Sequence, residues 1–401
     1  MEMKALFFPG WPLPADPVLG FGVILCLAIA LGELAHRFRL PRISAYVATG
    51  VILSFFRTAP QLAPLLSPAR AVFELAFALI LFELGQRLEL GWLRRNPWLL
   101  ACSLAESLLA FLAVGALMLW LKQPVILAVM IAAIAASSGP AVVLGICRDT
   151  EARGQLTDRL QLLTALSISY SFVVLGIAYA WQHGQSSAPL MQMLLHPLYL
   201  IAGSILLGSL TAGAVLRLLT LIRPGSFSQT LATIGLIIAS VALAKMLNLS
   251  VVLSALTAGV LSRSLDRKRQ LQAMDYGLLS RLALIVVFVA TGTLLDVQQF
   301  AGAFWPAVGL LVVRASAKTI GVLLFARPSG LPLRKASLLS VSLLPMSGAA
   351  LLWVERTASL WPEIGAQLAA VVLTALLIME CLAPPLLQWA LHRANETGDT
   401  A

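Results

Sequence analysis

The feature that most constrains this chain is a series of thirteen apolar segments, most of them long enough to cross a bilayer as a helix. Charged residues make up only 11% of the sequence, whereas a soluble chain needs far more charge to cover its surface. The sequence therefore predicts an all-α polytopic membrane protein, in which two segments are too short to cross upright, 43–56 and 249–262. The thirteen segments are 17–36, 43–56, 71–86, 98–120, 124–146, 160–181, 190–221, 227–247, 249–262, 277–295, 300–325, 336–354 and 364–391.

Basic residues are distributed unevenly between the predicted loops. When the loops are assigned alternately to the two sides of the membrane, most of the 28 lysine and arginine residues fall on one side, and the positive-inside rule identifies that side as cytoplasmic. This bias predicts an external N-terminus, a cytoplasmic C-terminus and a location in a cell membrane, which we expect to be a bacterial inner membrane. The net charge of +10 then reflects membrane topology, and no nucleic acid partner is expected.

No motif in the sequence indicates an enzyme, a metal site or a bound cofactor. A nucleophile elbow and a phosphate-binding loop are both missing from the sequence. The cysteines lie in or beside apolar segments without CxxC spacing, as is typical of small packing residues. They are Cys26, Cys102, Cys147 and Cys381. Membrane lipid is therefore the partner that composition itself implies.

The two halves of the chain resemble each other in three places, always in the same order. VATGVILS at 47–54 resembles LTAGVLSR at 256–263, LFELGQRLEL at 81–90 resembles VFVATGTLLDV at 287–297, and SSGPAVVL at 137–144 resembles MSGAALL at 346–352. Each repeat holds five segments, an odd number, so the second copy enters the membrane upside down. Inverted repeats are typical of secondary transporters that work by alternating access.

The repeats divide the chain into five predicted parts. Residues 1–36 hold an extra N-terminal helix, 40–181 the first inverted repeat, 190–247 linking helices, 249–391 the second inverted repeat, and 392–401 a short cytoplasmic tail. We expect the linking helices to form a scaffold or a dimer contact.

The third pair of repeated stretches predicts two broken helices. Each stretch places proline, glycine and serine inside an otherwise continuous apolar segment, and proline removes a backbone donor there. The residues are Ser137, Ser138, Gly139 and Pro140 in the first half, and Pro345, Ser347 and Gly348 in the second. A kinked helix packed through small residues is the alternative. Two breaks at symmetric positions favour a crossing whose carbonyls and hydroxyls face a cavity for an ion or a polar group.

Several stretches together resemble the cation:proton antiporter superfamily, the sodium/hydrogen exchangers, over nearly the whole chain. They are LPRISAYVATGVILS at 40–54, LFELGQRLEL at 81–90, the stretch from SSGPAVVLG to LTAL at 137–166, VFVATGTLLD at 287–296, and VVLTALLIMECLAPPLL at 371–387. The resemblance implies the antiporter fold with crossed broken helices, exchange of Na⁺ or K⁺ for protons, and a homodimer. It is less specific for the substrate, because a fold does not fix a function.

The chain departs from this family where the family binds its ion. Antiporters of the superfamily normally carry Asn-Asp or Asp-Asp in the helix after the first broken one, and that aspartate binds the cation or proton. The corresponding stretch here is 166–170, which offers the hydroxyls of Ser167, Ser169 and Tyr170, and the whole segment 160–181 contains no carboxylate. Hydroxyls do not titrate near neutral pH, so proton coupling requires another group.

Ionisable residues within the apolar segments are the candidates for that group. Arg314 and Lys318 lie one helical turn apart on one face, and Lys318 resembles the lysine that many antiporters pair with the binding aspartate. Glu106 has the longest apolar flanks among the candidate carboxylates, and both a structural salt bridge and a transport role are open for it. Glu83 is another candidate, with a structural role favoured. Glu33, Glu74 and Glu380 complete the set.

Three functions remain compatible with the sequence. The leading hypothesis is a secondary transporter that exchanges a monovalent cation, Na⁺ or K⁺, for protons, with Glu106 or Glu83 and Lys318 carrying the charge. The second is an antiporter fold that carries an organic solute or an anion, and the third is a non-transporting membrane subunit or sensor of a larger complex.

Overall fold

The computed structural model describes residues 16–38, 40–55, 69–88, 90–184, 190–222, 227–266, 277–293 and 297–398. The described ranges form helices and contain no β-strand. Ser138 and Met346 form an isolated antiparallel bridge. Seven of the described helices are long and apolar enough to cross a membrane, and shorter apolar helices lie among them.

The helices are α1 (Pro17–Arg37), α2 (Arg42–Ser54), α4 (Ala69–Gln86), α5 (Leu90–Arg95), α6 (Pro97–Trp120), α7 (Val125–Ala136), α8 (Pro140–Asp149), α9 (Gln155–Gly184), α10 (Leu190–Leu221), α11 (Phe227–Met246), α12 (Val251–Leu265), α13 (Gly277–Thr293), α14 (Val297–Ala326), α15 (Leu333–Ser342), α16 (Ala349–Leu360) and α17 (Pro362–Arg393). Local sequence explains where several of them begin. The side chains of Asp16, Asn96 and Ser250 cap α1, α6 and α12 by accepting hydrogen bonds from backbone N–H groups. A proline opens four helices, α1, α6, α8 and α17.

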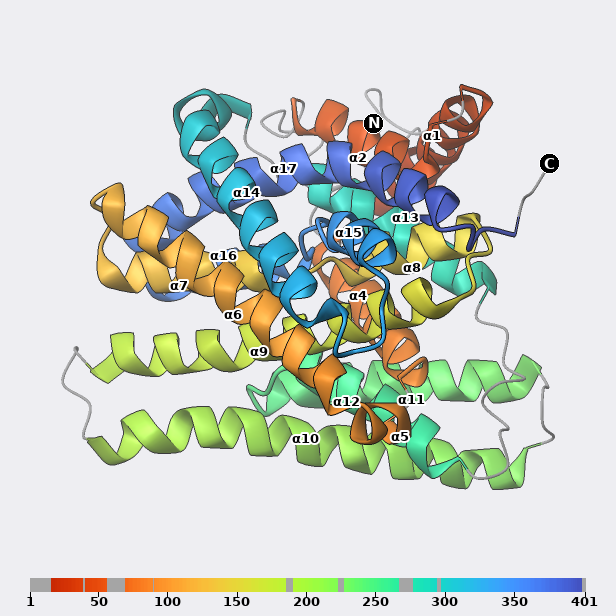
Figure 1. The fold of residues 1–401 in the computed structure, drawn as a ribbon. Helices are drawn as coiled ribbons and strands as arrows, with labels where there is room; N and C mark the ends of the chain where they lie inside the picture. Colours follow the sequence, from red (N-terminus) through yellow and green to blue (C-terminus); the bar gives the residue numbers. More distant parts are fainter. Residues whose placement is uncertain are drawn as a thin grey trace, which may run out of the picture.

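By their contacts the helices divide into two bundles. The core bundle consists of α6 to α9 and α14 to α17, and its most extensive contact joins α6 to α14. The scaffold bundle consists of α1, α2, α4 and α10 to α13, held together chiefly by the pairs α10–α12, α4–α12 and α2–α13. In Figure 1 the long helix α10 runs along the lower edge, away from the helices of the core bundle around α15.

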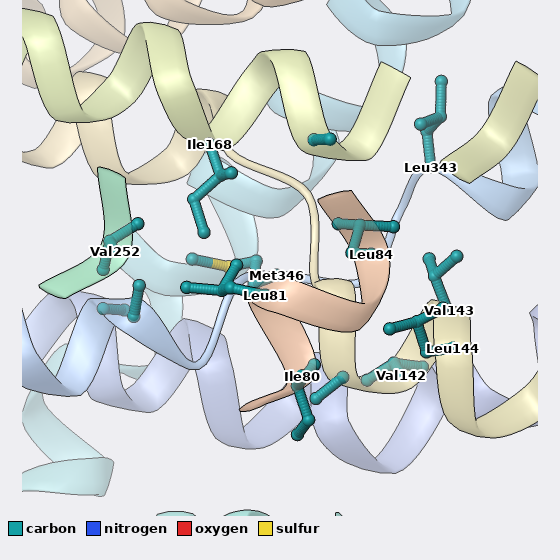
Figure 2. Close-up of a cluster of buried hydrophobic side chains, with 14 of the residues drawn as sticks. Ile80, Leu81, Leu84, Val142, Val143, Leu144, Ile168, Val252, Leu343 and Met346 are labelled. Atoms are coloured by element: carbon teal, nitrogen blue, oxygen red, sulfur yellow. The ribbon is translucent and has the colours of Figure 1, made fainter. Parts of the chain in front are cut away.

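Apolar side chains form much of the interface between the two bundles. Figure 2 shows side chains of the scaffold helices α4 and α12 gathered with side chains of α8, α9 and the segment 343–346 of the core bundle. The labelled residues, all buried, are Ile80, Leu81, Leu84, Val142, Val143, Leu144, Ile168, Val252, Leu343 and Met346. These apolar side chains pack closely across the interface.

Two glycine pairs set how closely the scaffold helices approach. A Cβ on Gly50 of α2 would lie 2.2 Å from the carbonyl oxygen of Val289 and 2.7 Å from the Cα of Gly292, both on α13. A Cβ on Gly259 of α12 would lie 3.0 Å from the Cα of Gly85 on α4. Side chains at these four positions would separate the backbones, because small residues are what allow membrane helices to touch.

Candidate functional site

Both interruptions predicted from the sequence are present, and the two broken segments cross. The first segment divides into α7 and α8, and the second into α15 and α16. At the crossing, the N–H of Gly139 donates to the carbonyl oxygen of Pro345 at 2.9 Å, and Ser138 forms the antiparallel bridge with Met346. A Cβ on Gly139 would lie 2.3 Å from the carbonyl oxygen of Met346. The crossing therefore requires glycine at 139.

The second break does not depend on its glycine in the same way. Gly348 has helical dihedral angles (φ −58°, ψ −16°), and a Cβ there would meet nothing closer than 3.7 Å. The hydroxyl of Ser347 instead accepts the N–H of Ala349 at 3.2 Å, at the first turn of α16. In the first break, Pro140 occupies the first position of α8, where its missing N–H costs nothing.

Arg314 of α14 fills the crossing, which corrects the expectation of a cavity lined by open carbonyls. Its side chain is fully buried, and its guanidinium donates to carbonyl oxygens on both broken segments. The distances are 2.5 Å to Ala135, 3.0 Å to Ser137, 2.5 Å to Leu344 and 3.2 Å to Pro345. Since α7 and α15 both end here, the cation also offsets the negative ends of two helix dipoles. The planar guanidinium has five N–H donors and can therefore bond several carbonyl oxygens at once.

Lys318 and Glu106 form a buried ion pair one turn along α14. Both side chains have no exposed surface, and the ammonium of Lys318 bonds the Glu106 carboxylate of α6 directly. The ammonium also donates to the hydroxyl of Ser138 at 3.1 Å, and the hydroxyl of Ser107 donates to the other carboxylate oxygen at 2.7 Å. The pair therefore lies beside the first helix break. Each of the two buried charges thus has a partner of opposite sign.

The hydroxyls of α9 differ in their relation to the crossing. Ser167 accepts the N–H of Ser138 at 3.1 Å and so belongs to it. Ser169 donates to the carbonyl oxygen of Ala165, on its own helix, at 2.9 Å. The phenol of Tyr170 lies towards Ser103 and Glu106, yet its oxygen completes no hydrogen bond of ordinary geometry within the described residues. The stretch predicted to stand in for the family's ion-binding motif thus contributes one contact to the crossing and one hydroxyl near the ion pair.

The remaining candidate carboxylates lie elsewhere. Glu83 bonds Arg87 at 2.8 Å and Arg148 of α8 at 2.5 Å, so it joins the scaffold bundle to the core bundle and is not brought to the crossing. Glu74 pairs with Lys245, and Glu33 pairs with Arg42 at 3.1 Å. Glu380 is buried in α17, and one of its carboxylate oxygens has no hydrogen-bond partner among the described residues.

Sequence reasoning missed three residues of the site. Ser107 was adjacent to a candidate carboxylate and could have been found from that position. Gly321 of α14 lies within an apolar stretch without any local signal, yet a Cβ there would lie 2.5 Å from the Cα of Glu106. This close approach of α14 to α6 is what allows Lys318 to reach the carboxylate. The buried hydroxyl of Ser103, one turn before Glu106, is the third.

The site contains nitrogen, hydroxyl and carbonyl groups with a single carboxylate, and no group of three or more possible metal ligands occurs among the described residues. A monovalent cation is bound by oxygen atoms alone, so the carboxylate of Glu106 and the neighbouring hydroxyls are the donors that it could use. The carbonyl oxygens at the crossing already accept hydrogen bonds from Arg314. The carboxylate of Glu106 therefore lies in the ion pair beside the crossing and not at the crossing point itself.

Comparisons with known proteins agree with this architecture. The sequence matches the family described as "Sodium/hydrogen exchanger, transmembrane" over residues 22–392. The structure is similar to that of the sodium proton antiporter MjNhaP1 from Methanocaldococcus jannaschii at pH 8, with a TM-score of 0.68 and 17% identity over 94% of this chain and 96% of that one. A structure of the same antiporter from electron microscopy gives a TM-score of 0.70 and 18% identity over 96% and 99%. The comparison with curated proteins returns no match.

Proposed function

This chain belongs to the sodium/hydrogen exchanger family, a family of cation/proton antiporters and not of enzymes, and we propose that it exchanges a monovalent cation for protons at the pair of Lys318 and Glu106. The observation that carries the proposal is the position of this pair, which is fully buried beside the broken helices and bonded to Ser138. A buried ionisable pair at such a point is costly and therefore marks an ion pathway in a membrane protein. Na⁺ and K⁺ are the proposed cations.

The same pair supplies what α9 lacks. The helix that normally holds the family's aspartate has no carboxylate between 160 and 181, whereas Glu106 approaches Lys318 from α6. The carboxylate has thus moved to a neighbouring helix of the same bundle, where it still faces the lysine of α14. Ser167 and Tyr170 remain on α9 as neutral neighbours.

The charges of the pair suggest how exchange proceeds. With its proton, Lys318 neutralises the Glu106 carboxylate; when the lysine loses the proton, a monovalent cation neutralises the carboxylate in its place. Both loaded states have the same net charge, and the guanidinium of Arg314 adds a constant positive charge to each. A state with neither proton nor cation leaves a bare carboxylate in the protein interior, which is strongly unfavourable. We therefore propose electroneutral exchange of one cation for one proton, with little uncoupled leak.

Alternating access requires two halves related by inversion, and the scaffold contacts support this part of the proposal. The sequence repeats relate Gly50 to Gly259 and Gly85 to Gly292. If a two-fold axis relates the halves, a contact of Gly50 with Gly292 implies a contact of Gly259 with Gly85, and both occur. With the basic bias of the loops, we propose thirteen crossings, an external N-terminus and a cytoplasmic C-terminus.

Exposed apolar side chains on the scaffold helix α10 require a cover of lipid or of a second copy. Leu198, Ile205, Leu206 and Leu210 are all more than two-fifths exposed. We propose a homodimer in a bacterial inner membrane, with α10 as the helix to test first by cysteine crosslinking. A crosslinked dimer should form through α10 positions and not through exposed positions of α6 such as Leu112.

The test of exchange is transport by the purified protein in liposomes that carry a pH dye. We expect addition of Na⁺ or K⁺ to dissipate an imposed pH gradient. In the Na⁺ experiment the membrane potential is set with valinomycin and K⁺. The rate of exchange should be the same at every membrane potential. Glu106→Gln should abolish exchange, and Glu33→Gln, the same chemical change at an exposed glutamate, should retain it. If Na⁺, K⁺ and Li⁺ all leave the gradient intact, the proposal is wrong. Exchange that survives Glu106→Gln would refute the assigned site.

A further inference from the structure

A pocket of about 400 Å³ lies between the two bundles, away from the ion pair. One wall comes from α9 and α16 of the core bundle, and the other comes from α10, the start of α12 and the turn between α11 and α12. Lys245 and Arg356 lie at this pocket, and the distribution of basic residues assigns both to the external side. We call it the outer pocket. Its volume falls within the range of small-molecule sites.

The outer pocket retains one positive charge. Glu74 of α4 and Lys245 of α11 bond each other directly and neutralise one another. Arg356 of α16 is half-buried and forms no ion pair and no side-chain hydrogen bond with any residue in the described ranges. A guanidinium held at an apolar pocket without a counterion is a ready partner for a carboxylate or phosphate group.

The wall formed by α9 and α16, which carries Arg356, is mostly apolar and aromatic. Phe172 and Tyr179 of α9 and Trp353 of α16 line the pocket together with leucine and valine side chains. The phenol of Tyr179 bonds the carbonyl oxygen of Trp353 at 3.2 Å and the hydroxyl of Thr357 at 3.0 Å, which ties α9 to α16. A preformed apolar wall with one convergent charge is the usual design of a site for a small amphipathic ligand.

We propose that the outer pocket binds an organic anion, whose carboxylate or phosphate pairs with Arg356 and whose apolar part packs against Phe172 and Tyr179. The chemistry also argues against a cation at this position, because an unpaired guanidinium repels positive charge. The outer pocket is thus a site separate from the pair of Lys318 and Glu106, and it does not depend on cation exchange. The anion can come from the aqueous phase or from the headgroup of an anionic lipid.

The first experiment measures binding of benzoate to the purified full-length protein by thermal unfolding, with uncharged benzamide as the matched compound at constant ionic strength. We expect benzoate to raise the melting temperature with saturation and benzamide to have no such effect. Arg356→Gln should weaken benzoate binding by about tenfold or more, as expected for loss of one charged contact. The control is Arg334→Gln, the same change at an exposed arginine of α15, which should bind benzoate as the wild type does.

A second arm distinguishes the two sources of the anion. The same titration is carried out in nanodiscs of phosphatidylcholine with and without phosphatidylglycerol. If phosphatidylglycerol weakens benzoate binding to the wild type, the headgroup occupies the pocket; if it does not, the ligand is a soluble anion. The proposal is wrong if Arg356→Gln binds benzoate as tightly as the wild type, or if neither benzoate nor phosphatidylglycerol distinguishes the two proteins.

Discussion

Breaking the buried ion pair should produce two opposite pH dependences, one for each partner. Glu106→Gln leaves Lys318 with the hydroxyl of Ser138 as its remaining partner, and Lys318→Gln leaves the Glu106 carboxylate with Ser107. Glu106→Gln is isosteric, Lys318→Gln shortens the side chain, and each change removes one charge. The stranded charge must then stay ionised in an apolar interior or change its protonation state on folding.

The protonation route sets an upper limit on the cost. An ordinary lysine, with a reference pKa of about 10.4, loses its proton at pH 7 for about 4.6 kcal/mol, and an ordinary glutamate with a reference pKa of about 4.3 gains one for about 3.7 kcal/mol. These limits agree with the roughly 3–5 kcal/mol lost when one partner of a buried salt bridge is removed. We therefore expect Glu106→Gln to destabilise the fold by about 4 kcal/mol and Lys318→Gln by slightly less.

The pH dependence follows from the protons that each state binds. In Glu106→Gln the unfolded lysine binds a proton that the folded lysine gives up, so the loss of stability shrinks as the pH rises, by about 1.4 kcal/mol per unit. In Lys318→Gln the folded state binds the extra proton, so the loss shrinks as the pH falls. The double variant has no stranded charge and should lie within about 2 kcal/mol of the wild type.

The assay is the melting temperature of the detergent-purified protein between about pH 6 and pH 9. For a chain of 401 residues the entropy of unfolding is about 0.8 kcal/mol/K at most, so that 4 kcal/mol corresponds to a fall of at least about 5 °C. Exposed Lys122→Gln and Glu33→Gln serve as controls and should shift the melting temperature little at any pH. Equal pH slopes for the two buried variants, or single variants as stable as the double variant, would refute the ion pair.

Three further results are expected from the same stability assay. Gly139→Ala should destabilise the crossing by more than about 2 kcal/mol because its Cβ has no room, whereas Gly348→Ala should be neutral or slightly stabilising; equal effects would contradict the geometry described. Arg314→Lys should cost about 3 kcal/mol, because an ammonium cannot bond carbonyls on both broken segments; a variant as stable as the wild type would count against this role. Burial alone would raise the pKa of Glu396. Hydrogen bonds from backbone N–H groups at the start of α9 and from Lys335 have the larger effect, and they hold the pKa of Glu396 below its ordinary value of 4.5. Glu396→Gln should therefore lower the melting temperature at pH 7, and its difference from the wild type should disappear as the pH falls below that value; a difference that persists in acid would show that the carboxylate is not the cause.

Much of the fold could be predicted from the sequence because membrane helices obey local rules. Apolar length places the segments, since every backbone polar group in a bilayer must be satisfied within its own helix. The breaks predicted at 137–140 and 345–348 were visible for the same local reason, because proline and glycine interrupt an apolar run there. The absence of a carboxylate between 160 and 181 was equally a property of the sequence.

The tertiary structure decided which charges meet. Lys318 and Glu106 are 212 positions apart. The long apolar flanks of Glu106 made it a candidate, but they did not identify its partner, and Glu83 bonds Arg87 and Arg148 instead. The pairing depends on the approach of α14 to α6 at Gly321, which is a matter of packing between distant helices.

Arg314 illustrates the same division. The sequence placed a cation within a predicted membrane helix, where composition alone suggests an unmet charge. The fold supplies carbonyl oxygens from two broken helices that only the crossing brings together. By itself the sequence determined that this is a polytopic membrane protein with two interrupted helices and no acidic residue between 160 and 181. Only the tertiary structure decided which buried carboxylate pairs with Lys318, because the cost of burying a charge depends on neighbours from elsewhere in the chain.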